Sequence, residues 1–109
     1  MRTFGKADVS RVIGYIHANT GANISLAAMA AIAGVSRNHF VSLFTKATGL
    51  APHQYVLRAR IDTAKLYLQD ETLSIAEVSR RTGFRTQEHF TKVFRKLVGI
   101  TPREFRSAL

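Results

Sequence analysis

Apolar residues recur every three or four positions along most of this chain, which is the spacing of one face of an α-helix. The first such segment ends at residues 19–21, and its apolar positions are Val9, Val12, Ile13 and Ile16. A longer segment begins at Pro52 and is expected to run to about residue 69. Its expected buried stripe is Leu57, Ile61, Ala64 and Leu68. No segment shows the strict alternation of a strand, so the pattern predicts an all-α fold of about seven helices.

The other helices are expected in two copies of one unit, because residues 24–57 resemble residues 73–106. Ser25, Ala27 and Gly34 match Ser74, Ala76 and Gly83 at an offset of 49 positions. One extra residue follows Gly83, and six further identities then stand 50 positions apart. They are His39 and His89, Phe40 and Phe90, Phe44 and Phe94, Lys46 and Lys96, Gly49 and Gly99, and Pro52 and Pro102. Two helical segments rarely share glycines, prolines and aromatics in one order by chance, so the same supersecondary structure is present twice.

Each copy predicts a helix, a tight turn and a second helix. A serine opens the first helix as its N-cap, and Gly34 or Gly83 ends it with the positive φ that a sharp turn requires. Ser36 or Thr86 then caps a second helix whose buried face carries two phenylalanines. This succession is the helix-turn-helix arrangement. A glycine ends each second helix, and a proline three residues later starts the next helix, which is long in the first copy and short in the second.

These elements are expected to form one domain over residues 1–109, a length that suits a single small domain. Residues 8–50 are interpreted as the first helix-turn-helix unit. Residues 52–70 are interpreted as the connecting helix, and residues 73–109 as the second unit.

The composition favours a polyanionic partner. Sixteen Lys and Arg stand against seven Asp and Glu, and the net charge of +9 attracts nucleic acid over long distances. A basic protein without such a partner and a binder of anionic membranes are the alternatives that charge alone leaves open. The chain has no cysteine, which excludes a disulfide framework, a thiolate zinc site and a cysteine nucleophile.

Other classes of function find no support in the sequence. No apolar run approaches the roughly 20 residues of a membrane span, and the first residues lack the apolar stretch of a signal peptide. We therefore expect a cytoplasmic protein without a membrane partner. No glycine-rich phosphate loop, paired carboxylates or metal-ligand spacing is visible, so we expect no enzyme, no cofactor and no metal. We also expect no small molecule bound by this domain.

The order of opening helix, helix-turn-helix, connecting helix, helix-turn-helix and short final helix resembles the DNA-binding domain of the AraC/XylS family of bacterial transcription regulators. The most diagnostic stretch runs from Ser74 through Phe90 to Arg106, and the resemblance covers nearly the whole chain. It implies sequence-specific binding of double-stranded DNA by two recognition helices in the major groove. It also implies transcription activation beside RNA polymerase, the expected protein partner.

The exposed face of each second helix carries the candidate DNA contacts. Stepping 100° per residue from the aromatic stripe locates mostly short polar or charged side chains, on a helix slim enough for a major groove about 12 Å wide. The resemblance implies base contacts from Asn38, Val41 and Ser42 in the first unit and from Gln87, Glu88, His89 and Lys92 in the second. Phosphate contacts are expected from Arg37, Thr45, Lys46, Arg80, Arg81, Arg85, Arg95, Lys96 and Arg103.

Individual roles follow from the chemistry of the base edges. Asn38 or Gln87 can bond bidentately to adenine, and Lys92 can donate to guanine. Val41 can touch a thymine methyl group. Glu88 can accept from a cytosine amine, or it can pair instead with Arg85 or Lys92.

Two other readings of the whole chain stay open. One is an all-helical module whose basic face docks an acidic protein, and the other is a nucleic-acid coat without sequence preference. Sequence-dependent DNA binding with a steep salt slope would separate the specific regulator from both.

Overall fold

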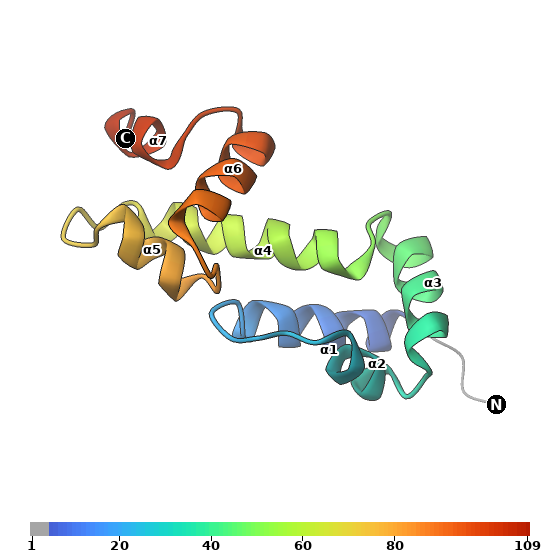
Figure 1. Ribbon diagram of the computed structural model, residues 1–109. Helices are drawn as coiled ribbons and strands as arrows, with labels where there is room; N and C mark the ends of the chain where they lie inside the picture. The colour runs from blue at the N-terminus through green and yellow to red at the C-terminus, as the bar shows by residue number, and fades with distance from the viewer. Residues whose placement is uncertain (1–4) are drawn as a thin grey trace.

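The computed structural model describes residues 5–109 (Figure 1). Its helices are α1 (Lys6–Ala18), α2 (Leu26–Ala33), α3 (Arg37–Thr48), α4 (Pro52–Tyr67), α5 (Ile75–Arg81), α6 (Gln87–Val98) and α7 (Pro102–Ser107). Residues 5–109 contain these seven helices and no strand, so the predicted all-α fold is confirmed. Residues 1–4 of the expected domain lie outside this range. None of the described helices is both long and apolar enough to cross a membrane.

Hydroxyl side chains begin five of the helices. The Oγ of Ser25 accepts a hydrogen bond from the backbone N–H of Ala28 at 3.0 Å, three residues further along. The same contact recurs at Ser36, Ser74, Thr86 and Thr101. Each bond satisfies one of the N–H groups that the start of a helix leaves without an intrahelical partner. The N-caps predicted from the sequence are therefore confirmed.

Both helix-turn-helix units turn in the same way. In each unit a backbone N–H donates to the carbonyl five residues earlier, from Val35 at 3.1 Å and from Phe84 at 3.2 Å. The preceding glycines, Gly34 and Gly83, have φ angles of 72° and 85°. This hydrogen bond across a left-handed glycine is the Schellman motif. Arg85, the extra residue of the second unit, follows the motif and lengthens the turn without changing how the first helix ends.

Each unit has its own hydrophobic core. The first core consists of Val12, Ile16, Met29, Ala30, Ala33, Phe40, Phe44, Val56 and Ala59. The second consists of Ile61, Ala64, Leu68, Val78, Phe84, Phe90 and Phe94. Because α4 supplies side chains to both cores, it joins the two units by packing as well as by chain connection.

The connecting helix buries two stripes, whereas the sequence pattern predicted one. Ile61, Ala64 and Leu68 are buried as expected, and Leu57 is half-buried. The prediction missed Val56 and Ala59, which are also buried and face the first core. The physical reason is that α4 has a neighbouring unit on each of two sides, so two different faces are removed from water.

α4 is the axis of an elongated molecule with principal extents of 52 × 22 × 21 Å. It contacts α1 and α3 of the first unit and α5 and α6 of the second. Figure 1 shows α3 beside the start of α4 and α6 crossing its later half. The helix ends at Tyr67, slightly before the predicted residue 69, and the chain continues there in hydrogen-bonded turns. The two second helices, α3 and α6, therefore pack at different places along α4.

Candidate nucleic-acid interface

α3 buries one face in the first core and exposes the other. The rings of Phe40 and Phe44 are fully buried, with centroids 5.3 Å apart. Asn38 and Ser42 are exposed on the opposite side. Val41 is half-buried and lines a hollow between α3, α4 and the loop before α2. The first unit therefore presents a short polar surface, with an aliphatic side chain at its edge.

α6 is built in the same way but carries more charge. Phe90 and Phe94 are fully buried, with ring centroids 5.7 Å apart. Gln87, Glu88 and Lys92 are exposed. The Nζ of Lys92 lies 3.7 Å from Oε1 of Glu88, so the structure contains one of the two pairings considered for this carboxylate. Such an exposed pair contributes little to stability and leaves both side chains free to turn toward DNA.

His89 stands at the start of α6 against an aromatic ring of the turn. Its imidazole meets Phe84 edge to face, with centroids 5.4 Å apart. Phe84 is buried, whereas His89 is exposed and lines a hollow between the two units. The turn of the second unit therefore helps to position His89, a predicted base contact.

Seven of the nine predicted phosphate contacts are exposed on or next to the second helices or on α7. They are Arg37, Thr45, Lys46, Arg85, Arg95, Lys96 and Arg103.

Two of these cations have further surroundings that the structure describes. Hydrogen bonds from Thr101 and the positive charge of Arg95 lower the pKa of Glu104 on α7. Lys96 lines a hollow between α6 and α4.

The other two predicted phosphate contacts, Arg80 and Arg81, are engaged within α5. Both pair with the carboxylate of Glu77, and the Arg81 Nε lies 2.9 Å from its Oε1. These hydrogen bonds, from Arg80 first and Arg81 second, lower the pKa of Glu77. The guanidinium of Arg81 also lies 5.8 Å from the ring centroid of Tyr67 on α4. Part of the positive charge of this helix is therefore neutralised internally.

Arg60 ties the two units together, and the sequence analysis assigned it no role. Its Nε donates to the carbonyl of Thr20 at 3.2 Å, and its Nη2 donates to the carbonyl of Ala22 at 3.1 Å. A Cβ added at Gly83 would lie 2.7 Å from the Thr20 oxygen and 3.0 Å from the Arg60 Nε. The loop after α1 therefore packs directly on the turn of the second unit. The signal that could have found Arg60 is its place on a helix with two buried stripes. The sequence pattern predicted only one of these stripes.

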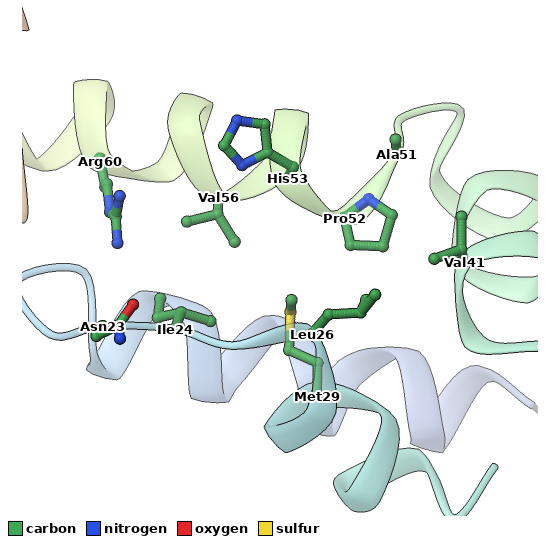
Figure 2. Close-up of a pocket in the computed structure, with 10 residues that line it drawn as sticks. All are labelled: Asn23, Ile24, Leu26, Met29, Val41, Ala51, Pro52, His53, Val56 and Arg60. Atoms are coloured by element: carbon green, nitrogen blue, oxygen red, sulfur yellow. The ribbon is translucent and has the colours of Figure 1, made fainter. Parts of the chain in front are cut away.

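Two hollows adjoin at this junction. One, of about 360 Å³, extends from Val41 along α4 to Arg60, and its lining is mostly apolar (Figure 2). The other, of about 390 Å³, extends from Arg60 to Arg85 and His89. Asn23 lines both hollows together with Arg60. The two hollows form one groove, which extends from the edge of α3 to the start of α6. We call it the central groove.

Comparisons with known proteins identify this arrangement. A sequence model described as a helix-turn-helix domain matches residues 29–108. The chain is also similar to the crystal structure of a transcriptional regulator of the AraC-type DNA-binding domain-containing proteins from Chromobacterium violaceum. The two share 30% identity and a TM-score of 0.88, over 94% of this chain and 91% of that one. This chain belongs to the AraC/XylS family. The resemblance expected from the sequence is thereby confirmed.

Other relatives of this AraC-type domain agree. The DNA-binding domain of AdpA, a global transcriptional factor solved in complex with a target DNA, is 29% identical with a TM-score of 0.86, over 93% of this chain and 91% of that one. The transcriptional activator NphR from Rhodococcus sp. is 37% identical over 91% of this chain and 30% of its own length. The chain spans 30–37% of the length of NphR and three other curated relatives. DNA binding in transcription regulation, the predicted function of the AraC-type domain, is confirmed.

Proposed function

We propose that this domain binds an asymmetric site of two base-pair boxes, with α3 and α6 in successive major grooves on one face of the duplex. The observation that carries the proposal is the pair of polar helix faces, each backed by two buried phenylalanines and both attached to α4. Successive major grooves on one face are about 34 Å apart. The long axis of 52 Å accommodates two reading helices at that spacing. The two helices differ in sequence, so their boxes should differ as well.

We assign base reading to the exposed side chains in the first turns of each helix. The first unit would use Asn38, Val41 and Ser42, and the second would use Gln87, Glu88, His89 and Lys92. Asn38 and Gln87 carry amides that match the adenine edge, and Lys92 carries a donor for guanine. Glu88 must leave its 3.7 Å pairing with Lys92 to accept from cytosine.

Phosphate contacts would position the domain without specifying sequence. We assign them to Arg37, Thr45, Lys46, Arg85, Arg95, Lys96 and Arg103, which are exposed. Arg80 and Arg81 join them only by sharing their charge between Glu77 and the DNA, because both already pair with that carboxylate.

The rigid attachment of both units has a consequence for the DNA. α4 supplies side chains to both cores, and if it does not flex, the angle between α3 and α6 stays the same when DNA binds. We expect the duplex rather than the protein to adapt, by a bend that costs on the order of 1–6 kcal/mol. Sequences that bend easily between the boxes should therefore be preferred.

The domain would act as part of a bacterial cytoplasmic transcription activator, placed on DNA beside RNA polymerase. The relative NphR carries the name of a transcriptional activator, which supports this direction of regulation. No catalytic step, membrane partner or small-molecule ligand belongs to the role proposed for this domain.

Selection of bound duplexes from a random pool tests the proposal. We expect an asymmetric two-box consensus that is preferred about 10³-fold or more over scrambled DNA at physiological salt. Asn38→Ala should then relax the base preference in one box and Gln87→Ala in the other, each by about 1–3 kcal/mol. Thr63→Ala, on α4 rather than on a reading helix, is the control and should leave the consensus unchanged. Equal affinity for consensus and scramble would overturn the proposal.

A further inference from the structure

We propose that the central groove binds one backbone phosphate of the DNA segment between the two boxes, with Arg60 as its main ligand. This site rests on the two-box function proposed above and adds to it a contact whose main ligand lies on α4, outside both reading helices. Its partners would be Asn23 and Arg85, which line the same hollow.

The first argument is the position of the groove. Val41, a predicted base contact of α3, lies at one end, and His89, a predicted base contact of α6, lies at the other. A duplex that receives both helices in successive major grooves must pass a minor groove and its two sugar-phosphate strands between them. In the proposed complex the central groove would face that stretch of the duplex. Figure 2 shows Arg60 and Asn23 at the end of the first hollow that lies farthest from Val41.

The second argument is the environment of Arg60. Its side chain is half-buried on α4, and within residues 5–109 no carboxylate lies within 4 Å of its guanidinium. Its known partners are the two carbonyls of residues 20 and 22. Removal from water lowers its pKa, although an arginine stays protonated throughout the physiological range. A cation that is partly desolvated and compensated only by carbonyl dipoles gains more from an anion than a solvated lysine does.

The third argument is the lining of the second hollow. Arg85 adds a second cation beside Arg60, and no acidic side chain takes part in the lining. Gly21 and Gly83 keep the backbones close, since a Cβ at Gly21 would lie 2.5 Å from the carbonyl oxygen of Arg81. Guanidinium groups bind phosphate through two parallel N–H donors, and Arg60 has five N–H groups, of which the carbonyls use one on Nε and one on Nη2. The second hollow therefore offers a positive and open site to a phosphate.

Such a contact would set the spacing between the boxes. A phosphate held at Arg60 lies at a fixed position relative to α3 and α6, because Arg60 is bonded to the loop of the first unit and packed against the turn of the second. Changing the number of base pairs between the boxes would move that phosphate out of the groove. The site would thus discriminate spacing rather than base sequence.

A scan with neutral phosphate replacements tests the site on the complete chain. Single methylphosphonates are placed at each position between the boxes of the selected duplex, and the affinity of each duplex is measured. We expect a loss of about tenfold at one or two adjacent positions, as for the removal of a charge-assisted hydrogen bond. The same loss should nearly disappear in Arg60→Gln and shrink in Arg85→Gln, because the contact is then already missing.

Matched variants separate the phosphate contact from a structural role. Arg58→Gln removes a charge from the same helix but from a residue that lines a different hollow, so it should keep the full methylphosphonate effect. Arg60→Lys keeps a cation and should keep part of that effect. Arg85 takes no part in the hydrogen bonds between Arg60 and the two carbonyls. Arg85→Gln therefore remains informative if Arg60→Gln unfolds.

The outcomes distinguish this site from the function on which it rests. If the wild-type domain prefers the two-box duplex but no intervening methylphosphonate weakens it, the central phosphate site is wrong and the two-box reading stands. An equal loss in wild-type, Arg60→Gln and Arg85→Gln domains would also overturn the site. If the wild-type domain prefers no sequence at all, the proposed function fails first, and the phosphate site fails with it.

Discussion

The two helix-turn-helix units share one backbone plan and divide their charge unequally. Residues 26–48 of the first unit contain two cations and no carboxylate, whereas residues 75–98 of the second contain six cations and two carboxylates. Both units nevertheless use the same caps, the same Schellman turn and the same pair of buried phenylalanines. The fold therefore depends on the shared positions, and charge is free to vary on the exposed ones. We infer that the second unit supplies most of the attraction to phosphate.

The turns of the two units also differ in what they contact. In the second unit Phe84 is buried in the core, and Arg85 extends the turn toward the central groove. Gly83 of that turn approaches the loop of the first unit more closely than any side chain would permit. At the corresponding place after Gly34, Val35 is half-buried and packs on the core of its own unit. The turn of the second unit therefore packs on its own core and also on the loop of the first unit.

The largest expected effect tests whether the two cores fold together. Phe40→Ala and Phe90→Ala each remove a fully buried ring, and each should lower the free energy of unfolding by about 3–5 kcal/mol. Because α4 belongs to both cores, we expect one cooperative transition in either variant, measured by circular dichroism in urea. Exposed Gln69→Ala is the control. Two separate transitions in either variant would show that the units fold independently and that α4 couples them weakly.

A smaller effect should distinguish the turn of the second unit from an ordinary helix end. Gly83 and Gly99 have similar positive φ angles, 85° and 97°. Gly99→Ala meets open space, so its cost should be the left-handed conformation alone, about 1–2 kcal/mol. Gly83→Ala adds a Cβ at 2.7 Å from the Thr20 carbonyl and should cost more in the same urea experiment. Equal costs would mean that the contact between the units relaxes freely.

The expected division of charge can be tested by exchanging equivalent residues between the reading helices. Thr45 of α3 corresponds to Arg95 of α6 in the repeat. If Arg95 contacts a phosphate, Arg95→Thr should reduce the slope of log affinity against log salt by about 0.9 and weaken binding severalfold. Thr45→Arg should raise the slope by a similar amount. An unchanged slope in Arg95→Thr would remove this residue from the set of phosphate contacts.

Local signals explain how much of the fold the sequence predicted. The glycines, prolines and hydroxyl caps act within a few residues, so the helix ends could be located from Ser25, Ser74 and their neighbours without a structure. The pairing of Arg80 and Arg81 with Glu77 was also accessible, since they stand three and four residues apart on one helix. The second stripe of α4 and the bonds of Arg60 were not, because they depend on how the two units approach each other. The carbonyl partners of Arg60 lie 38 and 40 residues away in the chain.

The smallest expected effect concerns the acid stability that the charges of α5 give to the second unit. The pKa of Glu77 is lowered by its hydrogen bonds to Arg80 and then Arg81, so the folded state holds this proton less tightly than the unfolded state. The stabilisation is therefore present above the ordinary glutamate value of about 4.3 and is lost as the pH falls through the lower, folded value. Glu77→Gln should lower the Tm slightly at pH 7, and the difference from wild type should vanish once the pH lies below the lowered, folded value. Glu71→Gln is the matched control, because no cation lies within 4 Å of that exposed carboxylate in the described part of the chain. α2 of the first unit has no carboxylate and therefore no such ion pair. If the Tm difference between Glu77→Gln and wild type does not change with pH, the effect originates outside this ion pair.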